Sequence, residues 1–207
     1  MRNTRTLTRR AVLAAVSVTT ALTLTACGND SGDGGSGHAS ASSSSAASAD
    51  ATAAAHNAQD MAFAQGMIPH HQQALEMAKL AADRASSAQV KDLASRIEKA
   101  QDPEIKTMTG WLTSWGEESM PGMDHSGGSA MPGMMDGSDM GELEKASGKD
   151  FDTMFLTMMI EHHKGAVAMA TTEKAKGEYG PATSLADAII TAQTTEITEM
   201  NKLLGKN

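Results

Sequence analysis

An internal duplication constrains this chain more than any other feature of its sequence. When residues 63–112 are laid over residues 155–204 without a gap, 17 of the 50 positions are identical. The shared positions are apolar residues at helical spacing, together with His, Met, Gln and Glu. The two copies therefore encode the same small structural unit, and both have kept the same polar side chains within it.

Each copy has the pattern of two amphipathic helices joined by a short turn. Its apolar residues recur with the period of a helix that buries one face. We predict helices over residues 59–84, 88–115, 150–176 and 182–204. Short turns make each copy an antiparallel hairpin, and neither hairpin alone can bury its apolar stripes. We therefore expect an all-α fold, a four-helix bundle built from the two hairpins about a pseudo-two-fold axis.

The residues before the first repeat have the pattern of an export signal followed by a tether. Residues 1–26 combine an Arg-rich start with an apolar run that is too short for a permanent membrane span. The run ends at Cys27 in a sequence that resembles a bacterial lipobox, whose cysteine is lipidated and becomes the mature N-terminus. Residues 27–56 are rich in Gly, Ser and Ala, which is typical of a flexible linker.

We therefore expect an exported bacterial protein that is lipid-anchored on the outer face of the cell membrane through Cys27. The alternative is an ordinary cleaved signal with an incidental cysteine. Thr8-Arg9-Arg10 loosely resembles a twin-arginine signal, so the export route stays open. Since Cys27 is the only cysteine, an intrachain disulfide is excluded.

The bundle domain is expected over residues 57–205, with repeat one at 57–115 and repeat two at 149–205. The connection between them, residues 116–148, is rich in Gly, Met, Pro and Asp. A connection of this length is usually mobile or functional. Six of the 16 methionines lie in it, where a polar loop offers them no core to fill.

A His-His motif forms the centre of each repeat. It occurs first as Met67-Ile68-Pro69-His70-His71 and returns as Met159-Ile160-Glu161-His162-His163. At 100° per residue, the two adjacent histidines of each motif straddle the inward face of the helix. A methionine lies one turn before each pair and another further along on the same side. We predict that these side chains bind a metal: His70, His71, His162, His163, Met67, Met77, Met159 and Met169.

Imidazole and thioether ligands without a thiolate favour copper, as Cu(I), Cu(II) or both. A di-iron bundle needs a Glu-x-x-His pair on each of two helices, and that pattern is absent. Zinc would find few carboxylates or thiolates. The net charge of −8 becomes −12 without the four arginines of residues 1–26, which suits cations and argues against nucleic acid as a partner. The alternative interpretation is that the histidines and methionines only pack the core.

Two further groups of residues are expected to support the site. The second helix of each repeat carries polar residues within its apolar stripe. These residues can hydrogen-bond to the ligating histidines and orient them without binding the metal themselves: Gln101, Glu104, Gln193 and Glu196. They can equally bridge helices or reach solvent at the rim of the bundle. The connection supplies a weaker capture site, because ordering a Gly/Pro-rich loop opposes binding: Met120, Met123, His125, Met131, Met134 and Met135.

The two His-His motifs, with Ala74, Met77-Ala78 and the stretch Lys164–Ala170, resemble the two halves of the bacterial family called domain of unknown function 305. The resemblance covers residues 57–205. It implies a ferritin-like helical bundle, and it implies copper, since some members are exported copper-binding proteins linked to copper resistance.

Three functions remain open at this point. The first is an extracytoplasmic, membrane-tethered protein that sequesters or transfers copper; it is not an enzyme, because no nucleophile–base pair or acid–base pair of carboxylates is apparent. The second is a metal-dependent redox enzyme that consumes peroxide or superoxide with the same ligands. The third is a metal-free protein whose methionines scavenge oxidants. The delivery partner and the presence of a homodimer are also left open.

Overall fold

The computed structural model describes residues 55–117 and 131–206. Within these residues the chain is helical and has no strand. The predicted signal peptide with Cys27, nearly all of the tether, and the loop residues Met120, Met123 and His125 lie outside the described residues.

The described part of the chain contains five helices: α1 (Ala58–Arg84), α2 (Ala88–Ser114), α3 (Gly137–Lys145), α4 (Gly148–Lys176) and α5 (Gly180–Leu203). The four long helices were predicted from the apolar period, with ends that agree within two residues. The all-α class is therefore confirmed.

The short helix α3 was not predicted, because it lies in the segment taken as a connection. Local signals explain it. Asp136 accepts hydrogen bonds from the backbone amides of Ser138 and Asp139, and Asp139 completes the capping box. The fully buried Leu143 anchors the helix to the molecule, and the partly buried Met140 packs against the same apolar cluster. One buried residue gives no periodic pattern, which is why the sequence did not reveal this element.

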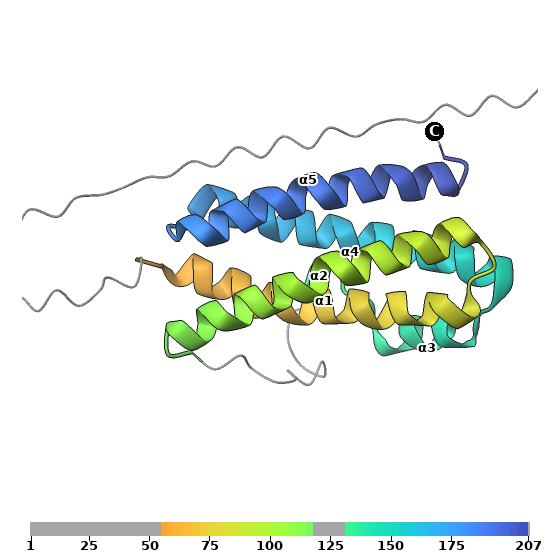
Figure 1. Cartoon of the computed structure of the whole chain (residues 1–207), viewed down its shortest axis with the longest axis horizontal. Helices are drawn as coiled ribbons and strands as arrows, with labels where there is room; N and C mark the ends of the chain where they lie inside the picture. The colour runs from red at the N-terminus through yellow and green to blue at the C-terminus, as the bar shows by residue number, and fades with distance from the viewer. Residues whose placement is uncertain (1–54, 118–130, 207) are drawn as a thin grey trace, which may run out of the picture. The chain divides into compact units, whose positions relative to one another are not determined.

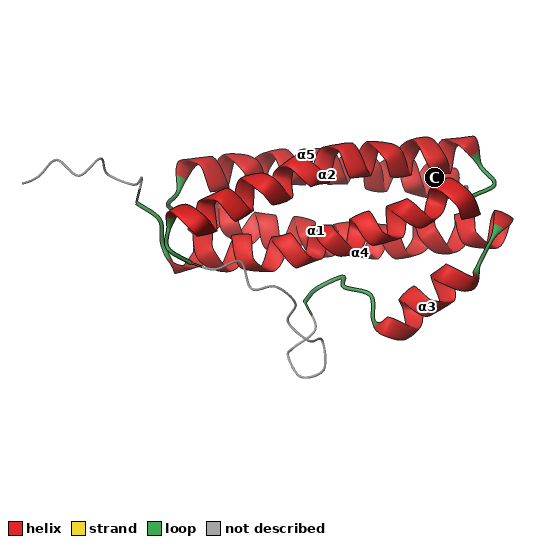
Figure 2. Cartoon of the chain, turned by 60° about the horizontal axis from the view of Figure 1, so that its bottom comes forward, coloured by secondary structure: helices red, strands yellow, loops and turns green. Residues whose placement is uncertain are grey.

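The long helices form two hairpins that meet through α1 and α4. In each hairpin the two helices lie side by side, α1 with α2 and α4 with α5 (Figure 1). The short α3 lies beside the α1 and α4 pair and not among the long helices (Figure 2). Because α1 and α4 bury both of their central His-His motifs, this helix pair positions the candidate site.

The apolar core is divided into two clusters, and antiparallel packing of α1 and α4 explains the division. One cluster joins the C-terminal half of α1, from Ala74 to Ala81, with the N-terminal half of α4, from Phe151 to Ile160. The other joins Phe63–Ile68 of α1 with Ala166 and Ala170 of α4. The four central histidines belong to neither cluster. They form a buried polar layer between two apolar ends.

Two buried aspartates, which are equivalent in the two repeats, tie the hairpins together. Asp60 of α1 accepts hydrogen bonds from the amides of Glu178 (3.2 Å) and Tyr179 (3.0 Å), in the turn between α4 and α5. Asp152 of α4 accepts from the amides of Ser86 (3.1 Å) and Ser87 (3.0 Å), in the turn between α1 and α2. Each hairpin therefore fixes the turn of the other one.

Candidate metal centre

The outer histidine of each motif is held by a glutamate of the neighbouring helix in its own hairpin. His71 Nε2 lies 2.7 Å from Glu104 Oε2, and His163 Nε2 lies 2.7 Å from Glu196 Oε2. A carboxylate accepts, so this contact assigns the ring proton to Nε2 and leaves the lone pair on Nδ1. Both Nδ1 atoms are buried, and neither has a hydrogen-bond partner among the described residues. A carboxylate that fixes a histidine in this way is the usual support of a metal ligand.

The inner histidines meet at the centre of the molecule. The rings of His70 and His162 lie 3.8 Å apart between centroids and are tilted by 43°. His70 Nε2 donates to the carbonyl oxygen of Pro132 at 3.1 Å, which leaves its Nδ1 as the acceptor. His162 makes no hydrogen bond through either ring nitrogen within the described segments. The two repeats thus place their inner histidines against each other, and of these two only His70 hydrogen-bonds to the described part of the Met-rich connection.

The inner imidazoles are neutral at physiological pH. Burial lowers the pKa of His70 to about 4, against the opposing effect of the Pro132 carbonyl. Burial and then the neighbouring His70 lower the pKa of His162 well below its usual value. The main chain of His70 has a smaller, opposite effect on the pKa of His162, although no hydrogen bond joins the two residues. A neutral imidazole has a free lone pair, which is the form that binds a metal.

Several buried polar atoms of this layer have no hydrogen-bond partner in the described part of the chain. Five buried imidazole nitrogens have none in the described structure, and neither do the side-chain oxygens of Gln101 and Gln193. An unsatisfied buried polar atom costs about 1–3 kcal/mol, so an accumulation of them calls for an explanation such as a bound ion or water. The donor set of neutral imidazoles fits a borderline or soft metal ion. Within residues 55–117 and 131–206, however, no three His, Cys, Asp or Glu side chains already form a metal cage.

The four predicted helix methionines flank the histidine layer on both sides. Met77 and Met159 are fully buried in the cluster with Phe151 and Phe155. Met67 is fully buried in the other cluster, and Met169 lies half-buried at its edge. Since a helix rises 1.5 Å per residue, Met67 and Met77 stand about 15 Å apart along α1. A single ion cannot use all four thioethers, so the predicted ligands divide into one His layer and two Met pairs.

The described part of the predicted loop site lies closer to the predicted helix site than the sequence suggested. Met131, Met134 and Met135 are half-buried, and their segment packs against α1 and α4 at the histidine layer. The residues that hold it there, Gln73 and Gly165, were not among the predicted site residues. Both lie within a few positions of the His-His motifs, but nothing in the spacing shows what they contact.

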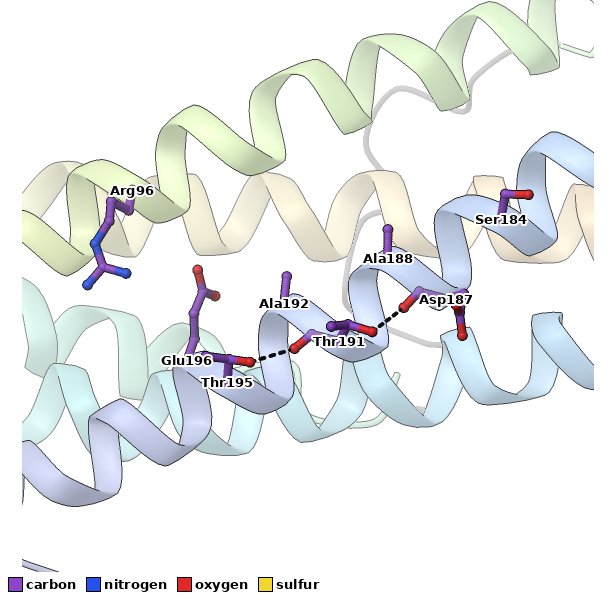
Figure 3. A pocket seen from close by; sticks show the side chains of 8 residues that line it. All are labelled: Arg96, Ser184, Asp187, Ala188, Thr191, Ala192, Thr195 and Glu196. Atoms are coloured by element: carbon purple, nitrogen blue, oxygen red, sulfur yellow. Dashed lines mark hydrogen bonds between the residues drawn. The ribbon is translucent and has the colours of Figure 1, made fainter.

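The supporting glutamates connect the buried layer with solvent. The side chains of Glu104 and Glu196 are 20% and 14% exposed, whereas their histidine partners are fully buried. Glu196 also lines a groove of about 580 Å³ between α2 and α5, with Arg96 on the opposite side and Asp187 further along α5 (Figure 3). Glu196 therefore contacts both this groove and His163.

None of the helices in the described ranges has the length and apolar character of a membrane span. No curated protein sequence matches the chain. Among solved structures, the chain is similar to a DUF305 protein from Streptomyces coelicolor that is described as secreted, with 32% sequence identity and a TM-score of 0.65. This match covers 72% of the present chain and 93% of the other. CopM in a Cu(II)-bound form is 37% identical with a TM-score of 0.61 and coverage of 70% and 94%. CopM in a Cu(I)-bound form is 34% identical with a TM-score of 0.60 and the same coverage of 70% and 94%.

The sequence profile of the family "Domain of unknown function (DUF305)" matches residues 60–204, which include all five helices except the first two residues of α1. Both His-His motifs and both supporting glutamates lie inside that match. The chain therefore belongs to the DUF305 family.

Proposed function

We propose that this protein is an extracytoplasmic copper-binding protein that sequesters or transfers copper through His and Met ligands. The observation that carries the proposal is the central layer of four buried histidines with five unpartnered ring nitrogens. Two of these rings are fixed by carboxylates, and two are kept neutral by burial. CopM, which is similar over most of its length, has Cu(I)-bound and Cu(II)-bound forms.

The ligand chemistry favours copper over harder ions. The histidine layer lies between thioether pairs, and no thiolate is available apart from Cys27. Thioether sulfur suits Cu(I), and imidazole suits both oxidation states. In this proposal the ion is cargo, bound by His70, His71, His162 and His163 with methionines of the flanking pairs, and Gln101, Glu104, Gln193 and Glu196 support the histidines.

The proposal also includes the setting of the domain. The four long helices are assigned to a four-helix bundle of the ferritin-like kind, with α3 as an addition on its outside. Cys27 is assigned as the lipidated residue that holds the exported protein at the membrane, and residues 27–56 as the tether. The neighbour from Streptomyces coelicolor, described as secreted, supports the export.

Metal titration of the full chain tests the proposal. Cys27→Ser in every sample removes the only thiol, which would otherwise bind copper itself. Cu(I) and Cu(II) are titrated against a chelator of known affinity, and bound metal is measured by elemental analysis. We expect a tight copper site that disappears when His70, His71, His162 and His163 are all replaced by Ala.

His56→Ala is the matched control, because His56 stacks on Trp115 away from the histidine layer, at a ring distance of 4.3 Å. It should bind copper like the parent protein. Circular dichroism verifies that the fourfold variant remains helical. Unchanged tight binding in a folded fourfold variant would show that the histidines only pack the core. Turnover of peroxide or superoxide by the copper-loaded protein would favour the enzymatic alternative.

A further inference from the structure

The end of the Met-rich connection is clamped to α1 by one side chain. Gln73 Nε2 donates to the carbonyl oxygen of Met135 at 2.8 Å, and Gln73 Oε1 accepts from the amide of Met135 at 2.8 Å. The side-chain amide thus satisfies both main-chain hydrogen-bonding groups of Met135. Gln73 is itself 9% exposed, so these two bonds form at a nearly buried position. Such a clamp fixes where the segment crosses α1.

The same segment touches the backbone of α4 at a place where two glycines meet. A Cβ on Gly165 would lie 1.8 Å from the carbonyl oxygen of Pro132, and one on Gly133 would lie 2.5 Å from that of Glu161. Gly133 also has φ of +79°, in the left-handed region that favours glycine. Only the absence of both side chains allows this approach. It brings the Pro132 carbonyl to His70 Nε2.

The docked segment brings Met131 to the same glycine of α1 as Met169, a predicted helix ligand. The Sδ atom of Met131 lies 3.7 Å, and the Cε atom of Met169 3.0 Å, from the point where a Cβ on Gly66 would stand. The ends of both methionines therefore gather over the same glycine of α1, one turn before His70. Met135 differs, because it packs against the apolar cluster of Met77 and Phe155. Within one short segment, Met131 lies over the same glycine as the end of Met169, and Met135 packs against the core.

We propose that residues 131–135 are a docked part of the central site, that Gln73 and Gly165 are the positioning residues that hold them, and that Met131 and Met169 form a thioether pair for a soft monovalent ion. The proposal deepens the proposed copper function and rests on it. It merges part of the loop site with the helix site, which the sequence interpretation kept apart. Because docking has already ordered the segment, its thioether binds without the entropic cost of ordering a free loop.

The docking is tested first, without metal. Gly165→Ala places a methyl group on the Pro132 carbonyl while favouring the helix itself, so α4 should remain intact. Gln73→Ala removes the clamp. In hydrogen exchange followed by mass spectrometry, both variants should exchange the 131–135 amides faster than the parent. Gly110→Ala is the matched control, since it makes the same change inside α2 where a Cβ meets nothing within 4 Å. Unchanged protection of residues 131–135 in both variants would overturn the docking role of Gln73 and Gly165.

The thioether pair is tested with Ag⁺, a soft monovalent probe that does not change oxidation state under these conditions. In the full chain with Cys27→Ser and ¹³C-methyl methionine, Ag⁺ should shift the NMR signals of Met131 and Met169. Met131→Leu should weaken this site by about tenfold or more, the loss of one coordinating contact. Met135→Leu makes the same change at the methionine that packs against the apolar cluster, and it should leave Ag⁺ affinity unchanged. Gly165→Ala should weaken binding as Met131→Leu does.

The outcomes separate this inference from the proposed function. If Met131→Leu and Met135→Leu both bind Ag⁺ like the parent, Met131 is no ligand and the inference fails, while copper binding by the histidines stands. If the parent chain binds neither copper nor Ag⁺, the proposed function fails and takes the thioether pair with it. If Met131→Leu weakens Ag⁺ binding and the fourfold His→Ala variant does not, the thioether pair binds metal independently of the histidine layer, and its assignment to the central site is overturned.

Discussion

Glu173 offers a test of how far burial controls ionisation in this fold. The residue lies in α4, is fully buried, and has no hydrogen-bond donor at bonding distance from either oxygen among the described residues. Burial raises its pKa to about 7, and the neighbouring Asp60 carboxylate adds to the effect. Asp60, which accepts from the turn before α5, has a lowered pKa and stays ionised. Of the two neighbouring carboxyl groups, Glu173 is therefore the one that keeps its proton to higher pH.

The sign of the pH dependence follows from which state ionises first. Below pH 4.5 Glu173 is protonated in both states and has no effect on the pH dependence of unfolding. As pH rises from 4.5 to about 7, the unfolded chain loses this proton while the folded protein keeps it, so stability falls. At 1.36 kcal/mol per pH unit, this window gives a loss of at most about 3 kcal/mol, complete above pH 7.

Glu173→Gln keeps the shape of the side chain but cannot ionise. We expect it to match the parent protein near pH 4 and to be more stable by about 1–3 kcal/mol at pH 8. The measurement is urea unfolding of metal-free protein, with a chelator present, at several pH values between 4 and 8. Glu178→Gln is the control, because Glu178 is exposed in the adjacent turn and should change little. A constant difference between Glu173→Gln and the parent over the whole pH range would refute the argument.

Three further predictions concern the hairpin contacts, the supporting glutamates and the membrane anchor. Asp152→Ala should lower the free energy of unfolding by about 2–3 kcal/mol, because the amides of Ser86 and Ser87 lose their buried acceptor. Urea unfolding measures this change. Asp150→Ala, at an exposed position of the same helix, is the control and should have little effect. Glu104→Gln and Glu196→Gln should each weaken copper binding by about 10- to 100-fold, whereas Glu76→Gln, at an exposed position, should not. Competition with a chelator measures the copper affinity of each variant. Unchanged affinity in the first two variants would mean that these glutamates do not support metal ligands. Cys27→Ala should release the protein from membranes in cell fractionation, and a variant that stays in the membrane fraction would contradict lipid anchoring at this residue.

The sequence by itself determined the helices and the repeat. Apolar spacing is a local property, so the ends of the four long helices could be predicted from it. The duplication also predicted that matching residues would have matching environments. His71–Glu104 and His163–Glu196 have the same sequence separation and the same 2.7 Å contact. The contact found in one copy is therefore the contact found in the other.

Only the tertiary structure decided how the polar side chains are grouped. A helical projection places Met67, His70 and Met77 on one face but ignores distance along the axis. Antiparallel packing of α1 on α4 puts Met77 with Met159 on one side of the histidines and Met67 with Met169 on the other. The docking of residues 131–135 is equally invisible in the sequence, because it depends on two glycine contacts and one amide clamp between segments distant in the chain. The raised pKa of Glu173 likewise comes from burial beside Asp60, and burial is a property of the assembled helices.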